Sequence, residues 1–165
     1  MKNIVLIGMP ACGKSTLGVV LAKTLGRGFI DTDLIIQQQQ KRLLQDIINT
    51  DGLEHFLDCE RDAVMSVICE NCVIATGGSV VFRDDAMRHL KENGTVVFID
   101  VPVEMLEARL SNIRTRGIAA AKGETVAEIY SERLPYYKKY ADIVLTANGD
   151  NIEQSVEELI RMLGE

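Results

Sequence analysis

The sequence predicts an α/β fold in which a parallel β-sheet is covered by helices on both faces. Five apolar segments of strand-forming composition alternate with helical patterns along the 165 residues. Strands that alternate with helices form parallel sheets through right-handed crossovers. A glycine-rich loop also follows the first of these strands and opens the first helical pattern. Ligands of such folds bind at the carboxyl ends of the strands, so this loop lies where a ligand is expected.

The individual elements follow from the period at which apolar residues recur. Short apolar runs predict the strands, and apolar residues at helical spacing predict the helices between them. A chain of this length suits one domain over residues 1–165. The expected strands are 3–8, 29–32, 72–76, 95–100 and 143–146. The expected helices are 15–25, 34–49, 53–69, 84–92, 103–111, 124–139 and 151–163.

The glycine-rich loop has the spacing G-x-x-x-x-G-K-[ST] of a phosphate-binding loop, in the residues Gly8-Met9-Pro10-Ala11-Cys12-Gly13-Lys14-Ser15-Thr16. Its glycines let successive N–H groups point at phosphate oxygens, and the following helix adds its partial positive charge. Lys14 would reach the β- and γ-phosphates, and the Ser15 hydroxyl would bind Mg²⁺. Chance gives such a match in roughly 1% of chains of this length, so a glycine-rich turn without a ligand is the weaker alternative. We expect the chain to bind a nucleoside triphosphate.

Two carboxylates, Asp31 and Asp33, end the second expected strand. Residues two apart on an extended chain point to the same side, so both would face one site. That site is beside the γ-phosphate if this strand lies near the first. Asp31 would then serve the magnesium ion through water, and Asp33 would accept the proton of an attacking hydroxyl. An N-cap on the next helix is the alternative role for Asp33.

Three other features carry weaker signals. Gly77 and Gly78 would let backbone approach a ligand closely, although a tight turn explains them nearly as well. Residues 111–124 lack periodicity and include Arg116, so we expect a mobile loop that carries cations; a flexible connection with incidental arginines is the alternative. Arg133 is a candidate for gripping a carboxylate or phosphate, although a lone arginine is more often at the surface.

The composition argues against several classes of partner. A net charge of −6 and a pI near 5.0 argue against a nucleic-acid or anionic-membrane surface, both of which need a basic patch. No apolar run approaches 18 residues, and the first strand begins without a signal peptide before it. We expect a cytoplasmic monomer. Cys69 and Cys72 have C-x-x-C spacing but lie where a helix meets a strand, which favours a structural role over a redox pair.

Together these motifs resemble the shikimate kinase family, over nearly the whole chain and in the same order. The resemblance implies the fold of the nucleoside monophosphate kinases, a P-loop fold with a five-stranded parallel sheet of order 2-3-1-4-5. It also implies transfer of the γ-phosphoryl group of ATP to the shikimate 3-hydroxyl, with Mg²⁺ as cofactor. The matching residues are Gly8–Thr16, Asp31-Thr32-Asp33, Ala75-Thr76-Gly77-Gly78, an arginine-bearing lid, and Glu132-Arg133-x-Pro135-x-Tyr137 followed by Ala141-Asp142.

The resemblance implies roles for single residues as well. Lys14, Asp33 and Arg116 would be catalytic, with Arg116 in a lid at about 111–124 and Arg109 stacked on adenine. The acceptor would bind beside a helical region at about 34–70. The implied ATP-binding residues are Gly8, Met9, Pro10, Ala11, Cys12, Gly13, Lys14, Ser15, Thr16, Arg109 and Arg116. The implied acceptor-binding residues are Asp33, Gly77, Gly78 and Arg133, and the implied metal-binding residues are Ser15 and Asp31.

The acceptor side departs from the family pattern. Phe-Arg-x-x-Glu becomes Phe56-Leu57-Asp58-Cys59-Glu60, so Leu57 stands where a second carboxylate-binding arginine is expected. Removing one partner of a buried charge pair costs about 2–5 kcal/mol, or roughly 30- to 4,000-fold in affinity. Arg61 lies one helical turn further on, about 5.4 Å away, which makes it a poor substitute unless the helix shifts. The smaller departures are Ser79 in place of a third glycine and Arg116-Gly117-Ile118-Ala119 in place of Arg-Pro-Leu-Leu.

We therefore expect an ATP-dependent phosphotransferase of shikimate kinase type. Its acceptor would be shikimate or a related small, carboxylate-bearing hydroxy acid. Two alternatives stay open at this point. A nucleoside monophosphate kinase would need more arginines for its anionic acceptor, and a nucleotide-dependent switch would bind ATP tightly without acceptor turnover.

Overall fold

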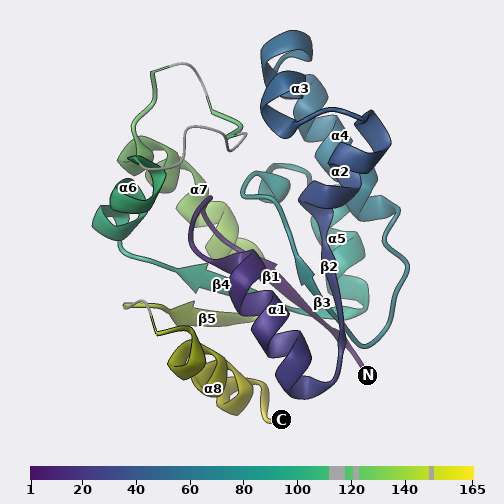
Figure 1. Ribbon diagram of the computed structural model, residues 1–165, viewed down its shortest axis with the longest axis vertical. Helices are drawn as coiled ribbons and strands as arrows, with labels where there is room; N and C mark the ends of the chain where they lie inside the picture. The colour runs from purple at the N-terminus through teal and green to yellow at the C-terminus, as the bar shows by residue number, and fades with distance from the viewer. Residues whose placement is uncertain (112–117, 121–122, 149–150) are drawn as a thin grey trace.

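The computed structural model describes residues 1–111, 118–120, 123–148 and 151–165. Its centre is a sheet of five strands in the order β2-β3-β1-β4-β5, and every neighbouring pair is parallel (Figure 1). This order confirms the predicted fold class. The strands are β1 (Asn3–Ile7), β2 (Gly28–Asp31), β3 (Cys72–Ala75), β4 (Gly94–Asp100) and β5 (Ile143–Thr146).

Helices cover both faces of this sheet. Helices α1 and α8 pack together on one face, and α5 and α7 lie against β4 on the other (Figure 1). Helices α2, α3 and α4 follow β2 and extend beyond the carboxyl ends of the strands. The helices are α1 (Lys14–Leu25), α2 (Thr32–Gln40), α3 (Leu44–Asp51), α4 (Leu53–Met65), α5 (Asp84–Glu92), α6 (Val103–Ser111), α7 (Val126–Tyr140) and α8 (Ile152–Leu163), with a 3₁₀ turn η1 (Val80–Phe82).

The hydrophobic core has two parts, and the second one positions the site. All five residues of β1 are buried, as expected for the central strand of a sheet covered on both faces. A second cluster holds α2, α3 and α4 together and contains Ile36, Ile47, Phe56 and Leu57. This cluster fixes which face of α4 is turned toward the carboxyl ends of β1, β2 and β3.

One predicted helix is wrong: residues 34–49 form two helices instead of one. Helix α2 ends at Gln40, and Lys41 adopts a left-handed conformation with φ of 52°, which ends an α-helix. Helix α3 then begins at Leu44. The break lets Ile36 of α2 and Ile47 of α3 enter the same second core. The helix predicted over 53–69 also ends early, at Met65.

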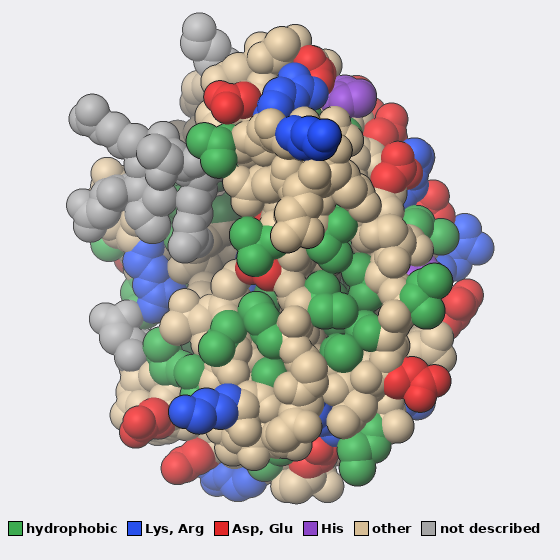
Figure 2. Space-filling model, turned by 45° about the vertical axis from the view of Figure 1, so that its right-hand side comes forward, with side chains coloured by type: hydrophobic (Ala, Val, Ile, Leu, Met, Phe, Trp, Pro, Cys, Tyr) green, Lys and Arg blue, Asp and Glu red, His purple; other side chains and the backbone are tan. Residues whose placement is uncertain are grey.

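The surface carries both signs of charge. On the face drawn in Figure 2, acidic and basic side chains are interspersed around the rim, and hydrophobic side chains gather across the centre. In the part of the chain that the structure describes, no helix is both long enough and apolar enough to cross a bilayer.

Candidate active site

The loop between β1 and α1 has the backbone that a phosphate-binding loop requires. Gly8 and Gly13 adopt φ of 147° and 96°, a region that favours glycine. A Cβ atom on Gly8 would lie 2.8 Å from the carbonyl oxygen of Ile99, so the loop passes directly against β4. The Lys14 amine donates to the carbonyl oxygens of Gly8 at 2.8 Å and Met9 at 2.7 Å. The amine is thereby held over the loop.

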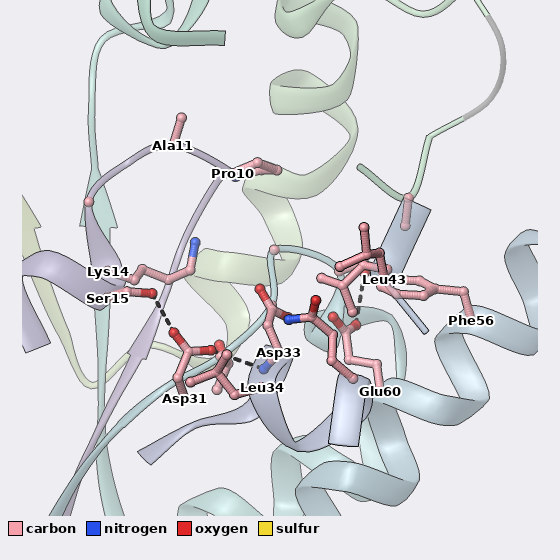
Figure 3. Close-up of a pocket in the computed structure, with 18 of the residues that line it drawn as sticks. Pro10, Ala11, Lys14, Ser15, Asp31, Asp33, Leu34, Leu43, Phe56 and Glu60 are labelled. Atoms are coloured by element: carbon pink, nitrogen blue, oxygen red, sulfur yellow. Dashed lines mark hydrogen bonds between the residues drawn. The ribbon is translucent and has the colours of Figure 1, made fainter. Parts of the chain in front are cut away.

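The end of β2 places a carboxylate against the first turn of α1. Ser15 Oγ donates to Asp31 Oδ2 at 2.6 Å, and Asp31 Oδ1 accepts from the Asp33 N–H at 3.0 Å (Figure 3). Asp31 is therefore the N-cap of α2, and the capping role considered for Asp33 is wrong. The Asp33 side chain instead lines a pocket.

That pocket is a cavity of about 330 Å³ between the phosphate loop, β2, and the helices α2, α3 and α4. It also reaches the glycine turn after β3 and the side of α7 (Figure 3). Arg109 lies outside its lining, with Nη1 donating to the Ala11 carbonyl at 3.0 Å. Arg116 lies outside the described residues. Of the residues expected in the site, the cavity brings together Pro10, Ala11, Gly13, Lys14, Ser15, Thr16, Asp31, Asp33, Gly77, Gly78 and Arg133.

Arg133 is a buried cation at this cavity. Its residue is 2% exposed, its Nη2 donates to the Ala119 carbonyl at 2.5 Å, and its guanidinium lies 5.5 Å from the centre of the Phe82 ring. Nε has no hydrogen-bond partner among the described residues. A buried donor left unsatisfied costs about 1–3 kcal/mol. Because Arg133 lines the cavity, its guanidinium is placed to bind an anionic group of a ligand.

Glu60 of α4 is another buried ionisable side chain at the cavity, beside Lys14 and Arg133, and the sequence did not single it out as a site residue. Its residue is 1% exposed, and Ser79 Oγ donates to its Oε1 at 2.8 Å. A Cβ on Gly77 would lie 2.0 Å from Glu60 Oε2, so a larger residue there would displace the Glu60 carboxyl group. Burial, aided by the Asp33 carboxylate, raises the pKa of Glu60 to about 8. The sequence signal that could have indicated its burial is its spacing of four residues from both Phe56 and Val64, which places Glu60 on the apolar face of a helix.

A glycine loop, three carboxylates and a buried arginine thus meet in one cavity. The family model described as shikimate kinase matches residues 10–164. The chain belongs to the shikimate kinase family. A shikimate kinase of Clostridium botulinum (strain Eklund 17B / Type B) is 38% identical over 99% of this chain and 98% of its own length. One of Persephonella marina is 32% identical over 97% and 98%.

Solved structures of the shikimate kinase family agree with the fold. The enzyme of Acinetobacter baumannii in complex with shikimate has a TM-score of 0.92 and 25% identity, covering 99% of this chain and 93% of that one. The Aquifex aeolicus enzyme has a TM-score of 0.82 and 30% identity over 98% and 96%. A gluconokinase of Sinorhizobium meliloti, at 15% identity and TM-score 0.54 over 99% and 91%, shares the fold alone. The chain is accordingly an ATP-dependent small-molecule kinase.

Residue 57 departs from the shikimate kinase pattern in its surroundings as well as in its identity. Leu57 is buried in the second core beside Phe56. Arg61 forms ion pairs with Asp58 at 3.3 Å and Asp62 at 2.9 Å and does not line the cavity. Arg61 therefore does not replace the arginine expected at position 57. Among the described residues that line the cavity, the cations are Lys14 and Arg133.

Tyr137 supports the glycine turn from α7, and its removal should weaken the fold. Its hydroxyl donates to the Gly78 carbonyl at 2.6 Å in a fully buried position. Tyr137→Phe leaves that carbonyl unsatisfied, so the free energy of unfolding should fall by about 1–3 kcal/mol. Urea denaturation measures this loss. Tyr136→Phe is the matched control because Tyr136 is 41% exposed; an equal effect of both variants would contradict the role of the Tyr137 hydroxyl.

Proposed function

We propose that this chain transfers the γ-phosphoryl group of ATP to the 3-hydroxyl of shikimate. The observation that carries the proposal is the buried cation Arg133, which lines the cavity that Lys14 and Asp33 also line. Shikimate has a carboxylate that Arg133 can bind and hydroxyl groups on its ring that can donate to Asp33. The solved structure of the A. baumannii relative is a complex with shikimate, which supports shikimate as the acceptor.

Each residue has one task in this reaction. The phosphate loop and Lys14 bind the β- and γ-phosphates, and Arg133 binds the acceptor carboxylate through its fork of donors. Asp33 accepts the proton of the attacking hydroxyl. Gly77 and Gly78 bring backbone against the acceptor. Catalysis is then mainly positioning and charge neutralisation, to which we assign Arg116 at the phosphates and Arg109 at the adenine.

The residues at the first turn of α1 suit a magnesium ion. The Ser15 hydroxyl and the Asp31 carboxylate lie 2.6 Å apart, and Mg²⁺ prefers such oxygen ligands, often through water. We propose that Ser15 holds the ion directly and Asp31 through water. When bound, the ion neutralises charge on the β- and γ-phosphate oxygens.

Steady-state ADP release tests the proposal. With ATP, Mg²⁺ and increasing shikimate, we expect release that saturates with shikimate concentration. A panel of nucleoside monophosphates, polyols and other hydroxy acids is run beside it. Release with a nucleoside monophosphate but not with shikimate would contradict the proposal in favour of a nucleotide acceptor. Tight ATP binding without release in any reaction would contradict it in favour of a switch.

Leu57→Arg should tighten the binding of shikimate. Residue 57 precedes Glu60 by three positions on α4, and residues so spaced are neighbours on a helix surface. A guanidinium there adds a third cation beside the cavity, which Lys14 and Arg133 already line. Regaining about 2 kcal/mol would strengthen binding roughly 30-fold by calorimetry. Leu57→Met, which keeps the volume without charge, is the control. Unchanged or weaker binding, in a variant that still binds ATP normally, would contradict the expectation.

A further inference from the structure

Glu60 is a carboxyl group placed in the acceptor cavity without an adjacent counter-ion. Its Oε1 accepts from Ser79 Oγ at 2.8 Å. Its Oε2 and Asp33 Oδ1 lie 2.0 Å and 3.1 Å from the same point, the Cβ position of Gly77. These two carboxylate oxygens are therefore separated by no more than the sum of those distances. Among the described residues, no lysine or arginine forms an ion pair with Glu60.

The charged groups that face Glu60 come from three elements. Asp33 of α2 opposes its ionisation, whereas Arg133 of α7 and Lys14 of α1 favour it. From the other helices packed against α4, the acidic groups are turned to surface arginines. Asp51 of α3 pairs with Arg42, and Asp85 of α5 lies near Arg61, so neither faces Glu60.

The leucine at position 57 explains why an ionised Glu60 would have no cation beside it on α4. A cation three positions before Glu60 on the same helix would lie beside it, but Leu57 is an apolar member of the second core. The cavity thus combines three carboxylates, from Asp31, Asp33 and Glu60, with the cations Lys14 and Arg133. An anionic acceptor must enter a site in which ionised Glu60 would repel it.

We propose that acceptor binding in this protein is coupled to protonation of Glu60, so that the acceptor carboxylate binds beside a neutral Glu60 carboxyl group. This inference rests on the proposed function, because it requires a carboxylate acceptor held by Arg133. A neutral carboxyl group removes the repulsion and adds an O–H donor that an ionised carboxylate lacks. The protonation state of Glu60 then determines how tightly the enzyme binds the acceptor.

The sign of the pH dependence follows from the burial of Glu60. Its pKa is raised to about 8, so Glu60 is protonated at pH 6 and largely ionised at pH 9. An anion bound next to Glu60 raises its pKa further. Acceptor affinity should therefore be constant at low pH and decline as pH rises through 8. Binding of the acceptor near pH 8 should be accompanied by partial uptake of a proton from solution.

Calorimetric titration of shikimate into the full chain with saturating ADP and Mg²⁺ tests this coupling. Titrations at pH 6, 8 and 9 in two buffers of different ionisation heat give both affinity and proton uptake. We expect no uptake at pH 6, uptake of about half a proton at pH 8, and about tenfold weaker binding at pH 9 than at pH 6. Glu60→Gln keeps the shape and should bind shikimate with pH-independent affinity and no uptake. Glu54→Gln is the matched control on the same helix, because Glu54 is exposed, and it should behave as the wild type.

The titrations distinguish a failure of the coupling to Glu60 from a failure of the proposed function. Binding of shikimate with equal affinity at pH 6 and 9 and no proton uptake would overturn the coupling but leave the proposed function standing. A pH dependence of shikimate affinity that persists in Glu60→Gln would assign the titration to another group and would also overturn the coupling. Absence of shikimate binding at every pH would overturn the proposed function itself. Wild-type proton uptake decides the first case even if the variant does not fold.

Discussion

Lys14→Ala should lower kcat by at least about 100-fold, the loss typical of removing one preorganised charge-stabilising donor. The Lys14 amine is held over the phosphate loop by the carbonyl oxygens of Gly8 and Met9. Lys14 belongs to the loop that we expect to bind the phosphates, so its charge is needed as the phosphoryl group moves. Steady-state ADP release with shikimate measures the loss.

The matched control for this variant is Lys23→Ala. Lys23 belongs to the same helix but lies in its last turn and is exposed, so kcat should be unchanged. The circular dichroism spectrum of Lys14→Ala should match that of the wild type, because the backbone of the loop is set by Gly8 and Gly13. A folded Lys14→Ala variant with more than a tenth of wild-type kcat would contradict the assigned role.

Arg133→Lys should weaken shikimate binding by about 30-fold or more while leaving ATP affinity unchanged. Lysine keeps the charge but loses the planar fork, including the Nε donor that has no partner among the described residues. A hydrogen bond to a charged group contributes about 1.5–3 kcal/mol, and 1.4 kcal/mol is a factor of ten. Calorimetry with shikimate and with ATP separates the two affinities.

Arg88→Lys is the control for that change. Arg88 also pairs with a carboxylate, Asp84 at 3.1 Å, but on the exposed face of α5, where such pairs contribute little. Its shikimate affinity should equal that of the wild type. Shikimate binding by Arg133→Lys within twofold of the wild type would contradict the assignment of the acceptor carboxylate to Arg133.

The position of the phosphate-binding loop between a strand and a helix could be predicted from the sequence because its signals are local. The loop Gly8–Thr16 directly follows β1 and runs into the first turn of α1, where Ser15 Oγ donates to Asp31 Oδ2. The five strands are short apolar runs whose burial follows from their composition. Their order, however, came from the family resemblance, since periodicity alone does not fix which strands are neighbours.

The acceptor half depends on contacts between distant segments, and there the sequence was less informative. The break at Lys41 has no glycine or proline to announce it, and it follows from packing of α2 and α3 into the second core. Glu60 stands within a recognised pattern, but its burial follows from the approach of Gly77 and Ser79. Arg133 is buried because α7 lies against Phe82 and Ala119, which no local pattern encodes.

Transfer of label from ATP marked in its γ-phosphoryl group tests the proposed reaction most directly. The enzyme is incubated with this ATP, Mg²⁺ and shikimate, and the products are separated and analysed by mass spectrometry and phosphorus NMR. We predict one labelled shikimate phosphate, substituted at the 3-hydroxyl, for each ADP formed, and formation at least about 100-fold slower with Lys14→Ala. ADP formation with the label in inorganic phosphate, or in an acceptor other than shikimate when both are supplied, would contradict it.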